Sequence, residues 1–456
     1  MSELWRRRIS RRDALRGGAV AAGLAAAACA APGTASKPTP ASSSKSGLGS
    51  STQLKVLQWS HFIPAYDTWF DGFVKDWGAA NGITATVDHI NTYDLPARIA
   101  TEVAAGSGHD LVEMNAQVLT YLYRKDLVNM DDINSYAQQK LGTPEPLVPK
   151  VAKVQGEWLG WVDFYIAILP IVNQALAQDA GMDATKLKTW NDYMKLGEAA
   201  KAKGHPAGIP ISHCNDSNHN WRAIMYSMGA SLAEADGKTL AINKPEFKTF
   251  LEFAQEFYTK ANTPEVFAWI DSSDNQWLDS GQGVMIHDAI SSMRSVEKTN
   301  PQLYSNLVLN PPEVGPAHPQ GLTVVDPNCY VIYKFSQNKE AAKAFLKHYI
   351  DNYHEAFLQS QLYNMPSHAN PWQHQLWTDS AYGGQWAEQK FAALQGVRGD
   401  KAVVFGYPGS PNYQANQALA EYVLPDAIAT AVKTPGSAGI QAAMSFLHGK
   451  LAGIYT

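Results

Sequence analysis

The sequence has few cysteines, and their spacing fits no common metal motif. Its 456 residues include three cysteines, Cys29, Cys214 and Cys329, and 115 positions separate the last two. No zinc site uses that spacing, so Cys214 and Cys329 either pair in an oxidising environment or stay buried as free thiols. The stretch 213–219 has a histidine at each end, but no further ligand pair flanks it. We therefore expect no metal site and no cofactor.

The chain also lacks a basic block and, after residue 28, any apolar run near the roughly 20 residues that cross a bilayer. Without residues 1–28, which hold six arginines and two acids, the formal net charge changes from −5 to −9. An acidic body of this kind is a poor partner for nucleic acid.

Common catalytic motifs are missing as well. The sequence contains no serine-nucleophile elbow, zinc-protease helix motif or phosphate loop. The acidic stretch 271–275 lacks the glycine that a calcium loop needs at its sixth position. Two facing carboxylates, for example Asp163 and Asp288, leave an exported glycoside hydrolase open as an alternative.

The N-terminus has the order of an export signal. Paired arginines within Ser10–Arg16 precede twelve small or apolar residues and then Cys29. This order is typical of a twin-arginine signal, and a cysteine after three alanines resembles a bacterial lipoprotein cleavage and acylation site. Ala26 stands where leucine is usual, so cleavage without lipidation stays open. We predict a signal peptide over 1–28, lipidation at Cys29, and a flexible Ala/Ser/Pro-rich tether over 29–52.

The start of the body alternates between strand and helix patterns. Strands are expected at 54–59, 83–87 and 111–114, and helices at 69–77 and 95–105, the second helix ending at a glycine. This alternation predicts a parallel sheet and the α/β class. Further predicted elements are helices at 247–258 and 342–350, capping residues at 336–338, strands at 283–286 and 330–333, and a loop over 310–328.

Short motifs in a fixed order run through nearly the whole body. They are Gln58-Trp59-Ser60, Leu95–Ile99, Gly108–Val112, Gly160–Asp163, Ile171–Asn173, Ser280–Ile286 and Ser336–Leu346. In order and spacing the chain resembles the extracellular solute-binding proteins of ATP-driven importers, the large family that includes the maltose- and glycerol-phosphate-binding proteins. The resemblance implies a two-lobed periplasmic-binding-protein fold of type II, each lobe a mainly parallel sheet flanked by helices and hinged around a ligand cleft.

The same resemblance implies a function and its partners. The chain is expected to be a monomer without enzymatic activity that binds a solute by closing its lobes and delivers it to the transmembrane subunits of an ABC permease. By analogy, lobe 1 covers 53–162 and 322–364, and lobe 2 covers 163–321 and 365–456. The expected location is the periplasm or the outer face of the cytoplasmic membrane, held there by the N-terminal lipid.

The cleft residues are expected to be aromatic and hydrogen-bonding side chains, because rings stack on sugar faces while Asp, Asn and His bond to hydroxyls. Strand ends and the resemblance select Trp59, Ser60, His61, Asn115, Gln117, Asp163, Tyr165, Asn220, Trp221, His287, Asp288, Asp326 and Tyr407, with Phe164 and His219 as neighbours. Trp59 and Trp221 are equally compatible with core packing, and Asp163 and Asp326 with loop caps. The solute expected from this chemistry is a sugar or oligosaccharide.

Other binding functions stay open. A glycerol-phosphate or glycerophosphodiester ligand requires positive charge, for which Arg98, Arg222 and Arg294 are candidates. A sensor or adhesin that passes its ligand to a receptor is a third possibility.

Overall fold

Two larger β-sheets organise the described part of the chain, which also contains two two-stranded sheets. The computed structural model describes residues 48–115, 120–373 and 389–455, all within one unit of the chain, Lys45–Thr456. The described strands are β1 (Gln53–Trp59), β2 (Thr84–Ile90), β3 (Leu111–Met114), β4 (Lys153–Val154), β5 (Glu157–Trp158), β6 (Trp161–Ile166), β7 (Leu169–Asn173), β8 (Met285–Asp288), β9 (Leu307–Leu309), β10 (Thr323–Val324), β11 (Asp326–Val331), β12 (Asn364–Pro366) and β13 (Ala402–Val403).

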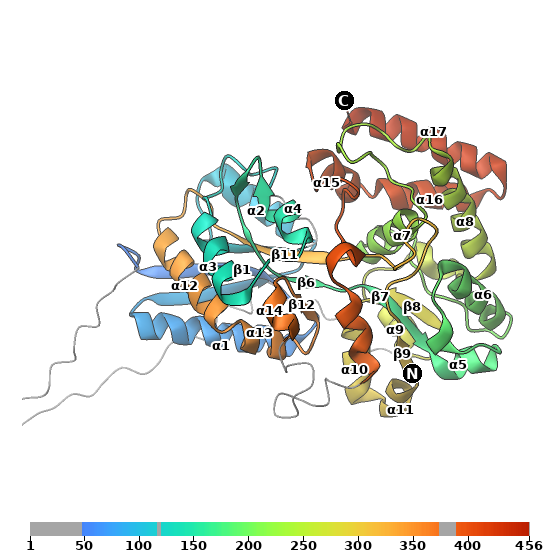
Figure 1. Ribbon diagram of the computed structural model, residues 1–456, viewed down its shortest axis with the longest axis horizontal. Helices are drawn as coiled ribbons and strands as arrows, with labels where there is room; N and C mark the ends of the chain where they lie inside the picture. Colours follow the sequence, from blue (N-terminus) through green and yellow to red (C-terminus); the bar gives the residue numbers. More distant parts are fainter. Residues whose placement is uncertain (1–47, 116–119, 374–388, 456) are drawn as a thin grey trace, which may run out of the picture. The chain divides into compact units, whose positions relative to one another are not determined.

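Helices connect and cover these strands (Figure 1). They are α1 (Pro64–Asn81), α2 (Leu95–Ala105), α3 (Asp131–Leu141), α4 (Leu147–Ala152), α5 (Gln174–Asp179), α6 (Trp190–Lys201), α7 (Asn215–Ser227), α8 (Pro245–Lys260), α9 (Ser273–Asp279), α10 (Ser291–Thr299), α11 (Pro301–Asn306), α12 (Lys339–Asp351), α13 (Tyr353–Gln359), α14 (Ala369–Gln373), α15 (Tyr413–Ala420), α16 (Val423–Lys433) and α17 (Ser437–Ile454).

The larger sheet has the order β12-β6-β11-β3-β1-β2, and a second sheet has the order β8-β7-β9. β1 runs parallel to β2 and β3, as the alternating N-terminal pattern predicts. β11 is antiparallel to β3 and β6, and β12 is antiparallel to β6. In the second sheet, β7 is antiparallel to both neighbours. The α/β class is confirmed, but the expectation of mainly parallel sheets is wrong.

The chain path explains the antiparallel pairs. β6 leaves the six-stranded sheet at Ile166, and β7 of the second sheet begins at Leu169. β11 later enters the six-stranded sheet at Asp326 after the second sheet has been built. A strand that returns from the second sheet enters where β6 left, so it runs in the opposite direction.

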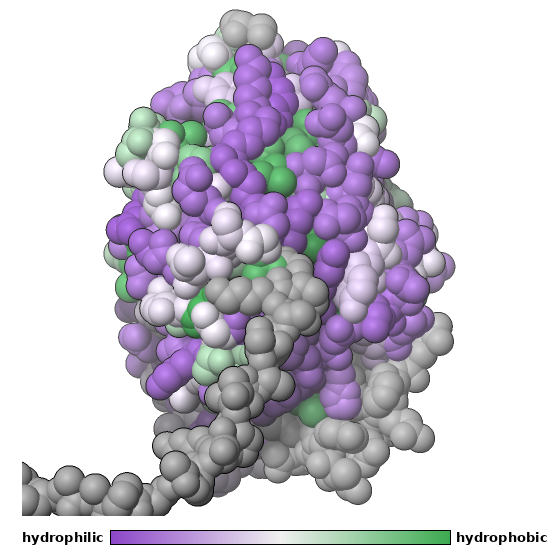
Figure 2. Space-filling view, turned by 90° about the vertical axis from the view of Figure 1, so that its left-hand side faces the viewer, coloured by the Kyte–Doolittle hydropathy of each residue, from purple (hydrophilic) through white to green (hydrophobic). Residues whose placement is uncertain are grey.

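Amphipathic patterns place the helices against the sheets. In α1, Tyr66, Phe70, Val74 and Trp77 follow helical spacing and are all buried. α2 spans the predicted range and is capped by Gly106, which has φ 61°, a left-handed conformation that costs glycine little. On the side that lies at the left of Figure 1, the surface in Figure 2 is mostly hydrophilic with scattered hydrophobic areas.

Some predicted boundaries shift. β8 begins two residues after the start of the predicted strand 283–286, and β11 ends before the predicted strand 330–333 does. The predicted loop 310–328 contains β10 and the start of β11. Asn338 stands at the N-cap position of α12 but makes no side-chain cap bond. Its side-chain oxygen accepts instead from the Thr52 backbone N–H at 3.4 Å, and its side-chain nitrogen donates to Asp110 at 3.1 Å. Tertiary contacts therefore occupy the oxygen that capping would use.

The cysteine alternatives resolve in favour of free thiols. Cys214 and Cys329 are both buried and unpaired with each other. Burial raises the pKa of both thiols, that of Cys214 to about 12, which keeps them protonated and unreactive. Among the described residues, no helix combines the length and apolar character needed to cross a membrane.

Gly160 gives a test of packing in the six-stranded sheet. A Cβ atom here would lie 2.5 Å from the Cys329 sulfur and 3.1 Å from the Tyr330 carbonyl oxygen. We expect Gly160→Ala to lower the free energy of unfolding by about 1–3 kcal/mol, because both neighbours are fully buried. Gly72→Ala is the control, since nothing lies within 4 Å of its added Cβ, and it should stabilise the chain slightly because it replaces a glycine inside α1. Urea unfolding of both variants measures the difference, and equal stabilities would show that the strands adjust freely.

Candidate functional site

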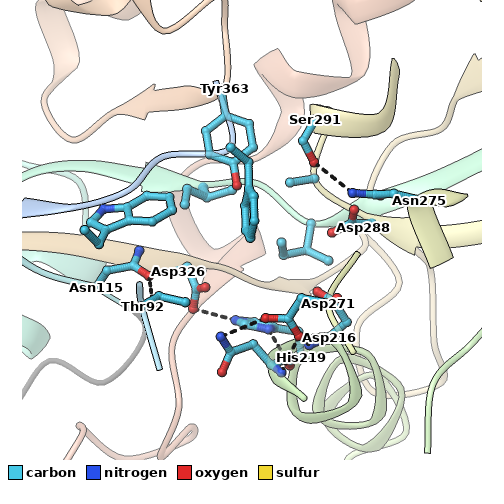
Figure 3. A pocket seen from close by; sticks show the side chains of 16 residues that line it. Thr92, Asn115, Asp216, His219, Asp271, Asn275, Asp288, Ser291, Asp326 and Tyr363 are labelled. Atoms are coloured by element: carbon cyan, nitrogen blue, oxygen red, sulfur yellow. Dashed lines mark hydrogen bonds and ion pairs between the residues drawn. The ribbon is translucent and has the colours of Figure 1, made fainter. Parts of the chain in front are cut away.

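One pocket is lined by residues from both sheets and from the N-terminus of α7. Its lining, drawn in Figure 3, consists of Trp59, Phe62, Thr92, Asn115, Ile166, Ile168, Asn215, Asp216, His219, Asp271, Asn275, Asp288, Ala289, Ser291, Asp326 and Tyr363.

Strand ends bring the polar lining together. Trp59 is the last residue of β1, Asn115 directly follows β3, Asp288 ends β8 and Asp326 begins β11. Ligands of α/β sheets bind in the crevice outside the carboxyl ends of parallel strands, where the chain order reverses. Asn115 is fixed there, because its amide nitrogen donates to Asn328 at 2.6 Å and its amide oxygen accepts from Thr92 at 3.0 Å.

Aromatic rings form another part of the lining. Trp59 is 1% exposed, whereas Phe62 is 47% exposed and lies edge-on to it with ring centroids 6.0 Å apart. The Tyr363 ring points into the pocket from the side opposite Asp216 and His219 (Figure 3). Rings of this kind can stack on a sugar face or attract a cation.

His219 and Asp326 form a buried ion pair across the pocket wall. His219 Nε2 lies 2.5 Å from Asp326 Oδ1, and the side chains are 2% and 10% exposed. Nδ1 lies 2.7 Å from the Asn215 carbonyl oxygen, which only accepts, so Nδ1 carries a proton. Burial by itself lowers the pKa of His219, but the charge and hydrogen bond of Asp326 outweigh it, and the pKa is raised. The pair is therefore an imidazolium and a carboxylate.

Asp271 is satisfied by the N-terminus of α7. Its Oδ1 accepts from the backbone N–H of Asn215 at 2.7 Å and of Asp216 at 3.4 Å, and its Oδ2 accepts from the Asn215 amide at 3.1 Å. The first N–H groups of a helix have no partners within the helix, and the helix dipole favours a carboxylate there. Asp271 therefore holds α7 in place at the edge of the pocket.

Three further carboxyl groups lie together. Asp274 Oδ1 accepts from the Asn275 backbone N–H at 2.9 Å, but Oδ2 of Asp274 and Oδ2 of Asp216 are buried without a hydrogen-bond partner. One oxygen each of Asp216, Asp274 and Asp288 lies within 4.8 Å of the others, and all three residues are buried. Burial, followed by neighbouring carboxylate charges, raises the pKa of Asp216 and Asp274 well above the usual value. Burial also raises the pKa of Asp288, to about 7. Close carboxylates that cannot all ionise show this behaviour.

Positive charge is scarce around the pocket. None of the described residues that line it is a lysine or an arginine, so His219 is the one cationic side chain of the described lining. The internal segments outside the described ranges, 116–119 and 374–388, contain no lysine or arginine in their sequences either. The arrangement can hold hydroxyl or cationic groups, whereas an anionic group would meet carboxylates.

Comparison with known families decides the relationship. The family model described as bacterial extracellular solute-binding protein matches residues 72–358. The chain belongs to this family. The predicted resemblance is confirmed, and an extracellular family supports the predicted export of this solute-binding protein. A comparison with curated proteins gives no match.

Solved structures of other solute-binding proteins share the fold. An ABC transporter solute-binding protein from Thermotoga lettingae TMO with bound α-D-tagatose is 16% identical, with TM-score 0.72 over 89% of this chain and 100% of that one. A sugar transporter protein from Arthrobacter chlorophenolicus A6 with laminaribiose is 15% identical, with TM-score 0.71 over 88% and 99%. Maltose-bound T. maritima MalE3 is 14% identical, with TM-score 0.71 over 88% and 99%. At these identities the likeness establishes the fold.

Four of the residues predicted from the sequence to bind ligand line the pocket of this solute-binding protein. They are Trp59, Asn115, Asp288 and Asp326, and their neighbour His219 joins them. All four stand at or beside the ends of strands, which is the reason the sequence could indicate them.

Two predicted residues lie close to Trp59 but outside the lining. Ser60 is exposed, and its N–H donates to the Ile90 carbonyl at 2.8 Å. His61 is buried against Trp59, and its Nδ1 lies 2.6 Å from Asp67. Gln117, a further predicted residue, lies outside the described residues, as does Cys29.

Asp163 and Tyr165 lie inside the six-stranded sheet instead of lining the pocket. β6 continues past both of them to Ile166, so neither stands at a strand end. Asp163 is fully buried, where it accepts from the Tyr349 hydroxyl at 3.3 Å, and burial raises its pKa. The Tyr165 hydroxyl donates to the Val397 carbonyl at 2.6 Å.

Asn220, Trp221 and His287 lie behind the lining. On α7, Asn215, Asp216 and His219 line the pocket, while the following residues turn into the core. Trp221 donates to the Pro210 carbonyl at 2.8 Å, as core tryptophans do. Asn220 Oδ1 lies 2.6 Å from His287 Nδ1, and the other ring nitrogen lies 2.8 Å from Glu313.

Tyr407 lies in a separate pocket, together with Arg222 and Tyr226. The positive charge considered for a phosphate ligand therefore does not reach the main pocket. Arg98 is bonded to Glu102 at 2.6 Å, and Arg294 to Glu297 at 3.0 Å. None of the three arginines lines the main pocket.

Sequence reasoning missed several residues of the lining. Those with recognisable chemistry are Phe62, Thr92, Asn215, Asp216, Asp271, Asn275, Ser291 and Tyr363. The stretch 213–219 is metal-like in sequence, and the stretch 271–275 is acidic. These signals could have indicated four of the missed residues, Asn215, Asp216, Asp271 and Asn275. Neither stretch indicates a pocket by itself, and the contact between them exists only after folding.

Proposed function

We propose that this protein is the substrate-binding component of an ABC importer and captures a carbohydrate in the pocket between its two sheets. The pocket carries this proposal, because aromatic rings stand there beside amide and carboxylate acceptors. Family membership supports capture of a solute outside the cytoplasm. Proteins of the same fold have been solved with tagatose, laminaribiose and maltose.

The proposal includes closure and delivery. Residues 53–162 with 322–364 would form one lobe, and 163–321 with 365–456 the other, closing on the solute as a monomer. The closed form would then dock on the transmembrane subunits of the permease. A twin-arginine signal over 1–28, a tether over 29–52 and a lipid on Cys29 would hold the body at the outer face of the cytoplasmic membrane, or in the periplasm if the lipid is absent.

We also propose that the protein binds its solute without converting it. The decisive experiment incubates the purified protein with each sugar that raises its melting temperature and analyses the mixture for products. Saturable binding with the sugar recovered unchanged is the expected result. Release of a shorter glycan would establish an exported glycan-acting enzyme instead. A phosphate-bearing solute is disfavoured, because carboxylates and no lysine or arginine stand in the described lining.

Phe62 offers a direct test of the pocket. Its ring is 47% exposed and lines the pocket, so Phe62→Ala should remove a stacking surface with little effect on the core. We expect sugar affinity to fall about 3- to 10-fold, since aromatic contacts contribute about 0.5–1.5 kcal/mol. Titration calorimetry measures the change.

The control for this variant is Tyr413→Ala. Tyr413 is also 47% exposed but does not line the pocket. Its replacement should leave affinity and melting temperature unchanged. If both variants bind sugar as tightly as the wild type, the solute does not contact this wall.

A further inference from the structure

The charges around the pocket do not balance. The Asp326 carboxylate is neutralised by His219 at 2.5 Å. Asp271 is satisfied by the amide groups that begin α7. Asp216 and Asp288, which also line the pocket, have no such cation among the described residues.

Two of the remaining oxygens are buried without a hydrogen-bond partner. Oδ2 of Asp216 and Oδ2 of Asp274 have none, and the residues are 6% and 0% exposed. Buried polar atoms of proteins almost always have partners. With one oxygen each of Asp216, Asp274 and Asp288 inside 4.8 Å, only protons or a cation can make the cluster stable.

We propose that the solute bound in this pocket carries a protonated amine, as an amino sugar does, and that its ammonium group binds between Asp216, Asp274 and Asp288. The inference rests on the proposed function, whose solute class it narrows. Asp216 and Asp288 open onto the same cavity as Trp59 and Phe62, so one organic molecule can meet both the carboxylates and the rings. Aromatic faces add to the attraction for a cation.

The number of acceptors matches an ammonium group. A primary ammonium has three N–H donors, and three carboxylates face one another here. A calcium ion takes six to eight oxygen ligands. The pocket beside the cluster is also lined by aromatic and amide side chains, which suit an organic solute better than a bare metal ion.

The test compares sugars that differ only in the amine. Glucosamine with glucose and galactosamine with galactose are titrated into the chelator-treated protein at pH 7.5, with N-acetylglucosamine as a neutral derivative. We expect at least one amine to bind tenfold or more tightly than its neutral partner. Asp216→Asn and Asp288→Asn should each reduce amine affinity at least tenfold and reduce neutral-sugar affinity much less, so that the preference for the amine over its neutral partner is lost. Asp279→Asn is the control, because this half-buried acid on α9 lies outside the lining.

Three results would overturn the inference. Equal affinity for both members of every pair would refute the preference for an amine and leave the proposal of a carbohydrate solute unchanged. Stabilisation by calcium chloride alone, with no amine effect, would identify the cluster as a metal site. Failure of every amine and every neutral sugar to bind would remove both the inference and the proposed function.

Discussion

Replacing Asp288 by asparagine is expected to stabilise the solute-free protein at pH 8 by roughly 2–4 kcal/mol. Burial raises the pKa of this carboxyl from 3.8 to about 7, so the folded chain resists its ionisation. The asparagine side chain would keep the shape of the protonated acid and carry no charge. Binding-site residues often reduce stability in this way.

The pH dependence of this gain follows from the raised pKa. Protonated Asp288 contributes its stability below the unfolded value near 3.8, and that contribution is lost as the pH rises through about 7. Asp216, Asp271, Asp274 and His219 face the same carboxyl group, and their charges and hydrogen bonds act on it. The gain of Asp288→Asn should therefore be full at pH 8 and nearly absent at pH 4.

Urea unfolding at pH 4, 6 and 8, with chelator present, measures this gain. Asp76→Asn is the matched control, because Asp76 is exposed on α1, and surface substitutions usually change stability by less than about 0.5 kcal/mol. A gain that is absent at pH 8, or independent of pH, would show that Asp288 is ionised at little cost in the folded protein.

His219→Gln is expected to destabilise the protein at pH 6 by about 3–5 kcal/mol. The change leaves Asp326, whose side chain is 10% exposed, as a buried carboxylate without a counter-charge. The pair joins α7 to the start of β11, so its loss also weakens the wall of the pocket. Asp326→Asn in the same chain should recover much of the loss, because it removes the uncompensated charge.

The stability that His219 contributes falls as the pH rises. The stability that comes from a carboxyl group with a lowered pKa falls instead as the pH decreases. The pKa of His219 is raised above 6.5, so its contribution is fully present below 6.5 and is lost as the pH rises through the raised value. The difference between wild type and His219→Gln should shrink between pH 6 and pH 9.

His213→Gln is the control for this pair. His213 lies 2.8 Å from Asp426, but its side chain is 60% exposed, and exposed ion pairs contribute only about 0–1 kcal/mol. Chemical unfolding of both variants at pH 6 and 9 gives the comparison. Equal small losses would mean that Asp326 reaches water when His219 is absent.

Local sequence was sufficient for several elements of the fold. α2 spans the predicted 95–105, and β3 spans the predicted 111–114. α2 follows from its apolar periodicity and a terminating glycine, and β3 from a short apolar run, all of which act within one turn or one strand. Strand ends also indicated Trp59, Asn115, Asp288 and Asp326 without knowledge of the pairing.

Residues whose position depends on where a strand ends in space were predicted less well. Asp163 was expected in the cleft, but β6 runs three residues further before the chain leaves the sheet. Tyr407 was expected in the same cleft, but it packs beside Arg222 in another pocket. The sequence does not show how far β6 continues in the sheet or which pocket Tyr407 enters.

By itself, the sequence determined the α/β class and the family, because these follow from periodicity and from motifs in order. Only the tertiary structure brought together Asp216 of α7, Asp274 of α9 and Asp288 of β8. In the chain they are separated by other elements, and each is an ordinary acid. Folding buries the three within 4.8 Å of one another. That burial raises the pKa of all three carboxyl groups and is the basis of the proposed preference for an amine.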